Sequence, residues 1–322
     1  MVHAFDAYVA AALFPREGAA FALGDGTVRF DSGEAVQAHD GVVLCAALHP
    51  SGSGVLTGGD DGRLVWSRPG GAETVADQKG KWIDAVAASP ETGLIAFAAG
   101  KAVTVRDVAD PGFIRTFVHE RSVAGLAFDP KGRRLACATY GGAALWFARI
   151  AEQKPAMLKW AGAHIDVTWS PDGRFLISAM QESDLHGWRI ADAKDMRMSG
   201  YPSKVRSMAF LQKGQLMATS GAAGVVLWPF GGANGPMNQS AIEIGHDQNA
   251  LVARVAAAPL SSGRLVAGLD DGRVWTAELA GKGLTALKAG KGPPITALAV
   301  SPDGTLAAWG DEAGGAGVVR LP

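Results

Sequence analysis

The residues that could do chemistry are few and lie far apart in the sequence. His119 and Glu120 begin like the two-histidine zinc motif of metalloproteases, but that motif needs a second His at position 123, where the chain has Val123. Gly-Lys pairs occur at positions 80, 100, 281 and 290, and none has the glycine-rich spacing and the following Ser or Thr that hold a phosphate. These patterns favour neither a metalloprotease nor a nucleotide-binding enzyme.

Other catalytic and metal-binding signals are equally weak. The sequence has no Cys-x-x-Cys pair and no Gly-x-Ser-x-Gly elbow, and its Asp-Gly turns lack the alternating carboxylates and distal Glu of a calcium loop. His186 lies near Met180, Met196 and Met198 in the sequence, which could form a soft-metal site or an adaptable contact surface, or could have a solvated or structural role. We predict no enzymatic activity, no cofactor and no bound metal.

Composition narrows the class of partner. The 30 basic and 31 acidic residues give a formal net charge of −1, so nothing favours nucleic acid or an anionic membrane as a partner. Cys45 and Cys137 lie in apolar runs and are expected to be buried thiols. The N-terminus lacks a basic segment before its short apolar run, and no stretch approaches the ~20 apolar residues of a membrane span. We therefore expect a cytoplasmic protein.

A repeat about 40 residues long runs through the chain, the period expected for four-stranded propeller blades. Its marker is an apolar strand followed by Pro, or a substitute, and then by Gly. The first residues of the eight markers are Pro15, Pro50, Pro90, Pro130, Pro171, Gln212, Pro259 and Pro302.

Each copy continues in a similar way after its marker. An apolar strand follows, as in Phe175 to Ala179, and often a tight Asp-Gly turn such as Asp61-Gly62. A third strand ends near a Trp in five copies, and a more polar fourth segment leads to the next copy. Mostly apolar inner strands and polar outer ones are typical of a small sheet packed between two neighbours. These tryptophans are Trp66, Trp146, Trp188, Trp228 and Trp275.

On these residues the chain resembles the WD40-repeat (WD-repeat) β-propeller family over essentially its full length. The resembling motifs include Trp169-Ser-Pro-Asp-Gly173 and Val300-Ser-Pro-Asp-Gly304, and His39, His164 and His246 resemble the family's Gly-His signature. The resemblance implies an all-β propeller, and the eight copies predict that it is eight-bladed, in a single domain, 1–322. We expect the segment from Met1 to Asp6 to pair with the last copy and close the ring; the alternative is seven blades.

The family's usual docking face implies a role for loop residues of this chain. It carries the loops before the first strand and between the second and third strands of each blade, and implies a non-enzymatic scaffold that binds a protein or peptide, as a monomer or as a subunit of a larger complex. The expected partner-binding residues are Trp82, Asp84, Arg121, Tyr140, His164, Gln181, Glu182, Asp184, Lys204 and Arg206, with Asp40, Lys81, Asp166 and Asn249 at equivalent positions.

Two alternatives stay open at this point. One is a metal-binding or hydrolytic propeller with a site in the central channel, which would need several His or carboxylate groups to converge there. The other concerns His39, His119, His164 and His246, each just before a first strand, which either bind a ligand or form hydrogen bonds within a blade.

Overall fold

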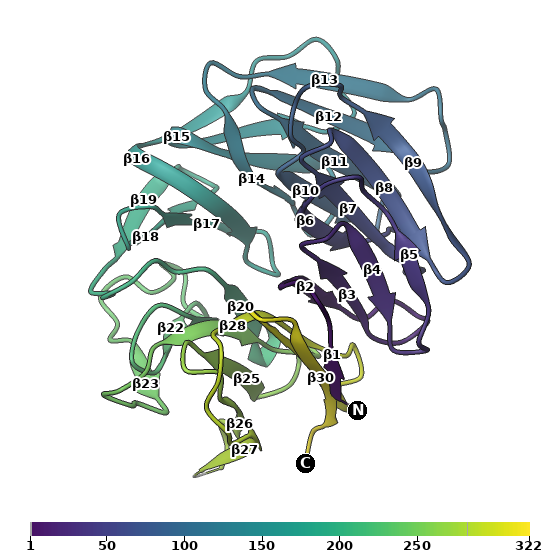
Figure 1. Cartoon of the computed structure of the whole chain (residues 1–322). Helices are drawn as coiled ribbons and strands as arrows, with labels where there is room; N and C mark the ends of the chain where they lie inside the picture. The colour runs from purple at the N-terminus through teal and green to yellow at the C-terminus, as the bar shows by residue number, and fades with distance from the viewer. Residues whose placement is uncertain (1, 282) are drawn as a thin grey trace. The chain divides into compact units, whose positions relative to one another are not determined.

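The protein is all-β, and its computed structural model describes residues 2–281 and 283–322. Traced through these residues, the strands form seven sheets, six with four strands and one with six (Figure 1). Within the residues described, the helical content is a 3-10 turn, η1 (Gln212–Gly214). Neighbouring strands pair antiparallel, and strands that follow one another in the sequence are joined by short connections within a sheet.

The four-stranded sheets follow the sequence copies closely. Three of them are β2 (Val9–Leu13), β3 (Ala20–Leu23), β4 (Thr27–Phe30) and β5 (Ala35–Gln37); β6 (Val43–Leu48), β7 (Val55–Gly59), β8 (Arg63–Arg68) and β9 (Gly71–Asp77); and β10 (Ala85–Ser89), β11 (Leu94–Ala99), β12 (Ala102–Asp107) and β13 (Ile114–Val118). The other three are β20 (Met208–Leu211), β21 (Leu216–Thr219), β22 (Val225–Pro229) and β23 (Ile242–Ile244); β24 (Val252–Ala256), β25 (Arg264–Leu269), β26 (Val274–Glu278) and β27 (Leu284–Lys288); and β28 (Ile295–Val300), β29 (Leu306–Asp311) and β30 (Gly315–Arg320) with β1 (Val2–Ala4).

The fourth and fifth sequence copies share the six-stranded sheet. It contains β14 (Val123–Phe128), β15 (Arg134–Phe147), β16 (Ala156–Trp169), β17 (Phe175–Met180), β18 (Leu185–Arg189) and β19 (Lys194–Met198). The prediction of eight separate sheets is therefore not supported, and the alternative of seven is.

The long strand β16 is the reason for the lower count. Its residues Ala156 to Ala163 pair with β15, and His164 to Trp169 pair with β17. Between these parts the sequence reads Ala161-Gly162-Ala163, without the Pro or Asp that ends a strand elsewhere in the chain. The extended chain thus passes from one copy into the next, and each part of the sheet still carries one copy.

The described chain divides into two compact units. Unit 1 comprises the chain up to Phe14, Ser170–Phe175 and Ser183–Pro322, and unit 2 comprises Pro15–Trp169 and Leu176–Glu182. Within unit 1, β1 pairs with β30, with Val2 opposite Gly317, and Phe5 donates its N–H to the Gly314 carbonyl at 2.9 Å. The predicted pairing of the N-terminal segment with the last copy is confirmed, except for Met1, which lies outside the described residues. The single domain expected over 1–322 stays a prediction.

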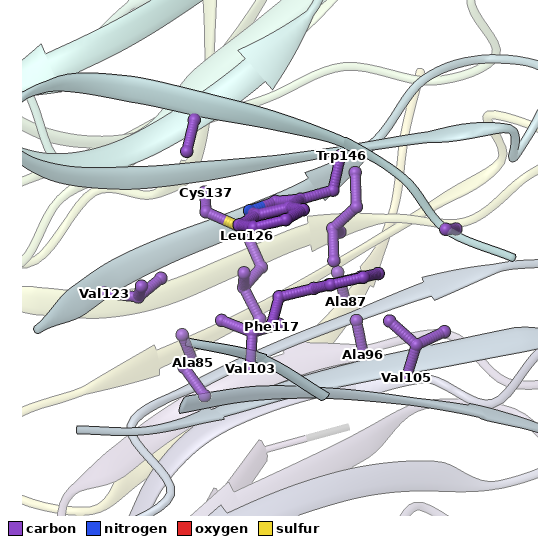
Figure 2. Close-up of a cluster of buried hydrophobic side chains, with 14 of the residues drawn as sticks. Ala85, Ala87, Ala96, Val103, Val105, Phe117, Val123, Leu126, Cys137 and Trp146 are labelled. Carbon is purple, nitrogen blue, oxygen red and sulfur yellow. The ribbon is translucent and has the colours of Figure 1, made fainter. Parts of the chain in front are cut away.

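The second strand of each copy forms the core. All six residues of β11 and all six of β17 are buried. In unit 2, apolar side chains of β10 to β13 pack against those of β14 and β15, where Phe117 stacks on Trp146 with ring centroids 4.5 Å apart (Figure 2). Burial of such apolar surface stabilises by roughly 25 cal/mol per Å². Neighbouring copies therefore stabilise one another through their sheet faces.

The predicted turns also form. In the turn Ser170 to Gly173, Gly173 has φ +72° and donates its N–H to the Ser170 carbonyl at 2.8 Å. Gly62 of the Asp-Gly hairpin has φ +83°, a conformation that a Cβ makes costly.

The strand-ending tryptophans divide into two groups. Trp188 is only 1% exposed, and Trp146 and Trp275 are also buried, which confirms their prediction as core residues. Trp66 and Trp228 are half-buried, and each donates its indole N–H, Trp66 to the Ser53 carbonyl at 2.8 Å.

Several of the histidines that precede a first strand form hydrogen bonds within a copy, which is one of the two roles predicted for them from the sequence. His39 Nε2 lies 2.8 Å from Thr57 Oγ1, and its Nδ1 lies 3.0 Å from Asp61. Trp146 donates to His119 Nε2 at 2.9 Å, in the fourth copy. The prediction is wrong for His246, whose exposed ring contacts Glu243 at 3.1 Å instead.

In the sixth copy a tyrosine, Tyr201, takes the position of the histidine. The Trp228 indole N–H donates to the Tyr201 hydroxyl at 2.6 Å, and that hydroxyl lies 2.7 Å from Thr219 Oγ1. Thr219 in turn donates to the Val226 carbonyl at 3.1 Å. Burial raises the pKa of the Tyr201 phenol to about 12, so it stays protonated and can act as both donor and acceptor.

Replacing Tyr201 by Phe tests this hydrogen-bonded chain. Tyr201→Phe leaves the Trp228 N–H without its acceptor, and we expect a loss of about 1–3 kcal/mol in the free energy of unfolding measured with urea. The matched control is Tyr140→Phe, at an exposed tyrosine, which should change it by less than about 0.5 kcal/mol. Equal stability of the two variants would contradict the role of Tyr201.

Candidate partner-binding loops

Trp82 lies on a tight turn of unit 2, with 64% of its surface exposed. Gly80 has φ +75°, and the Lys81 N–H bonds to the Gln78 carbonyl at 3.0 Å, which closes the turn. The next residue, Ile83, is fully buried and donates its N–H to Gly59 at 3.0 Å. The anchored Ile83 thus fixes the backbone beside Trp82.

Tyr140 and Arg121 are exposed in the fourth copy, also in unit 2. Tyr140 is 65% exposed and lies in β15 where the register with β16 shifts, next to Gly141 with φ +93°. Arg121 precedes the buried Val123, whose N–H bonds to the Gly100 carbonyl at 2.9 Å. Arg121 forms no ion pair within the described residues. Both side chains are therefore available to a partner.

The fifth copy adds a polar loop to unit 2. Gln181 is exposed, and its N–H donates to the Ala163 carbonyl at 2.9 Å. The Glu182 carboxylate accepts the Ala163 N–H at 3.2 Å, so this side chain also holds the two segments together.

His164 is wrong as a surface contact, because it is only 2% exposed. Its Nδ1 lies 2.7 Å from Ser178 Oγ and its Nε2 lies 3.1 Å from the Trp160 carbonyl oxygen. Both ring nitrogens are thus used inside the copy, where the imidazole joins β16 to β17. Burial lowers the pKa of this imidazole, which favours the neutral ring.

Asp84 immediately precedes a first strand of unit 2, and Asp166 lies near the start of another. Asp84 is exposed, and partial desolvation of its carboxylate raises its pKa. Asp166 is exposed to solvent on one side, yet protein atoms surround its carboxylate on the other, and desolvation raises its pKa to about 6. Its one hydrogen bond is the acceptance of the Val167 N–H at 2.8 Å. Such an ionised group costs free energy at neutral pH.

The remaining predicted residues lie in unit 1 and differ in availability. The Asp184 carboxylate accepts hydrogen bonds from Arg197, at 2.9 Å from Nε, so its charge is neutralised within the chain. Lys204 and Arg206 line a cavity of about 350 Å³. The predicted residues are thus divided between the two units, and Lys204 and Arg206 line one cavity.

The residues of the possible soft-metal site are buried. Met180, Met196 and Met198 have little exposed surface, and the buried His186 ring packs its edge against Trp188, which favours the structural reading. Among residues 2–281 and 283–322, no three His, Cys, Asp or Glu side chains gather as a metal ion would require. Both cysteines are free thiols, and burial raises the pKa of Cys45 to about 12. In the same residues, no helix is long and apolar enough to cross a bilayer.

The raised pKa of Asp166 predicts the direction in which the stability of the folded chain changes with pH. Because the folded chain binds this proton more tightly than the unfolded chain, stability contributed by Asp166 falls as pH rises from about 4 to 6. We expect Asp166→Asn to be more stable than the wild type at pH 7, and the difference to vanish below about pH 4. Urea unfolding of both proteins between pH 4 and 7.5 measures it.

The control for Asp166 is a carboxylate with the opposite shift. Burial alone would raise the pKa of Asp172, but hydrogen bonds from Ser170 and Arg174 lower it. Asp172→Asn should therefore be less stable than the wild type at neutral pH, with a deficit that shrinks as pH falls. If Asp166→Asn behaves like Asp172→Asn, the account of Asp166 is contradicted.

Comparison with known proteins agrees with this architecture. Residues 33–66 match the family model described as WD40: WD domain, G-beta repeat, which covers the copy that holds the His39, Thr57 and Asp61 contacts. No curated protein matches the sequence.

Two solved structures are similar in fold. The computationally designed protein Ika8 aligns with a TM-score of 0.77 at 18% identity, covering 99% of this chain and 98% of its own. The β-propeller domain of Cps50 (Swd1) from Myceliophteria thermophila aligns with a TM-score of 0.68 at 14% identity, covering 87% of this chain and 96% of that one. Together, the seven sheets and the likeness to the Cps50 propeller domain show a β-propeller fold, in which residues 33–66 match the WD40 repeat.

Proposed function

We propose that this chain is a non-enzymatic interaction protein that binds a protein or peptide through the loops of unit 2 formed by Trp82, Arg121, Tyr140 and Gln181. WD40 propellers generally mediate protein–protein interaction. The observation that carries the proposal is the exposure of two large aromatic side chains, Trp82 at 64% and Tyr140 at 65%, on turns that their neighbours hold in place. Trp, Tyr and Arg are the residue types that most often dominate interface energy.

Pre-organisation of these loops supports the same proposal. The backbone hydrogen bonds at Lys81, Ile83 and Val123 fix the turns before any partner arrives. Binding then orders few additional residues, so less conformational entropy opposes it. Asp84 and Glu182 add negative charge to these loops, and Arg121 adds positive charge, which gives the surface a means to select a partner's orientation.

Several finer properties belong to the proposal. The near-zero net charge favours a protein partner over nucleic acid or an anionic membrane. A cytoplasmic location and a role as a monomer or as a subunit of a larger complex fit an interaction scaffold, and the free, buried thiols fit a reducing compartment.

The test compares how much partner three forms of the full chain recover from a lysate: the wild type, a double variant of the proposed loops, and a control double variant. We expect Trp82→Ala combined with Arg121→Ala to lower the affinity for the recovered partner at least about tenfold, or 1.4 kcal/mol. Both side chains are exposed, so thermal melts should match the wild type.

The matched control is Arg133→Ala combined with Ile150→Ala, which also removes an exposed Arg and an exposed apolar side chain from unit 2. Arg133 precedes the strand segment that runs toward Tyr140, so it lies at the opposite end of that strand segment. Equal partner binding by both double variants would rule out the named loops.

A further inference from the structure

A cavity of about 350 Å³ in unit 1 is lined by three basic side chains, which a gap left by packing alone would not require. It lies beside β24 and the segments that precede β20 and β28. The charged side chains that line it are Lys204, Arg206, Arg254, Asp270 and Glu312, three basic and two acidic. This lining is polar enough to hold a charged ligand, and the volume is large enough for one.

The two arginines of this cavity have hydrogen-bond donors to spare. Arg254 is half-buried, and NH1 donates to the carbonyl of Ala253 at 2.9 Å. Throughout residues 2–281 and 283–322, neither Arg206 nor Arg254 lies within ion-pair distance of a carboxylate. A guanidinium carries five N–H donors, so most of the donors of this pair have no acceptor from the chain.

The two positive charges also act on each other. Burial, and to a smaller extent the charge of Arg206, lowers the pKa of Arg254 to about 10. Arg254 therefore remains charged at neutral pH, beside a like charge and partly out of water. An anion between the two guanidiniums would relieve this repulsion and accept the unused N–H groups.

The acidic residues do not perform this role. Asp270 Oδ1 accepts the Leu251 N–H at 2.8 Å, which ties that carboxylate to the loop before β24. Glu312 is exposed and lies on the rim, where its N–H bonds to the Pro294 carbonyl at 3.0 Å. The carboxylates thus border the cavity, and the arginine pair stays without a counter-ion.

We propose that the cavity formed by Lys204, Arg206 and Arg254 binds an oxyanion, with a phosphate monoester as the preferred chemical class. A phosphate group carries up to two charges and three acceptor oxygens, so it can bind both guanidiniums and the ammonium together, whereas a carboxylate offers one charge and two oxygens. The site lies in unit 1 and is independent of the proposed docking loops of unit 2. If an experiment disproves the oxyanion site or the docking loops, the other proposal can still be tested by its own experiment.

The test is calorimetric titration of the full chain with inorganic phosphate at constant ionic strength, with acetate as the monoanionic reference. We expect saturable one-site binding of phosphate that is tighter than that of acetate. Arg206→Gln should weaken phosphate binding at least tenfold. Arg254→Lys, which keeps the charge but loses the forked donors, should also weaken it.

The matched control is Arg320→Gln, which removes one exposed charge from the same unit but outside the cavity. It should bind phosphate as the wild type does. The proposal is overturned if phosphate shows no saturable binding, or if Arg206→Gln and Arg320→Gln weaken it equally, because equal loss would indicate only a general charge effect.

Two further ligands identify the source of the phosphate group. Free O-phosphoserine is compared with a short peptide that contains phosphoserine, using the wild-type chain and Arg206→Gln. Binding of either ligand that depends on Arg206 supports the site. Equal affinity for both indicates a small phosphate ester, and tighter binding of the peptide indicates a phosphorylated chain.

Discussion

Burial of the second strand on both faces is the constraint on which the rest of the structure depends. Strands β11 and β17 have no exposed residue, and a lone four-stranded sheet cannot cover both faces of such a strand. Neighbouring copies supply the missing cover, as Phe117 and Trp146 do where they stack in unit 2. Small residues in these strands, such as Ala96 and Ala98 in β11 and Ser178 and Ala179 in β17, allow the sheets to approach closely.

Polar contacts then fix each copy's loops on this apolar base. A side chain in or before the first strand contacts the second strand in three copies: His39 with Thr57, His164 with Ser178, and Tyr201 with Thr219. The chemistry differs, but each contact satisfies buried polar groups close to the loops that carry the candidate residues. The loops can therefore vary in sequence, as binding surfaces do, while their ends stay in place.

The sequence predicted the strands well because period and turn chemistry are local properties. The Pro and Gly markers located the turns, and the apolar runs located the buried strands. The number of sheets was harder, since it depends on whether Ala161 to Ala163 break the strand or continue it. Tyr201 was missed because a hydroxyl can replace an imidazole only when the partner groups are already in place, and His246 was misassigned for the converse reason.

The candidate sites depended still more on tertiary structure. Exposure of Trp82 and Tyr140 fitted the loop positions that the resemblance implied, but the burial of His164 and the pairing of Asp184 with Arg197 could not be read from spacing. Arg254 escaped notice because its position in a strand says nothing about a cavity or a neighbouring charge. A family resemblance thus located the loops, and only the packed structure separated available groups from engaged ones.

Amide hydrogen exchange of the full chain tests the central constraint most directly, because exchange rates report the local free energy of opening. We expect the slowest amides of each sheet in the doubly covered second strands, such as β7, β11, β25 and β29, and faster exchange in the outer strands β9, β13 and β27. If the second strands exchanged as fast as the outer strands of the same sheets, mutual burial would not be what holds this protein together.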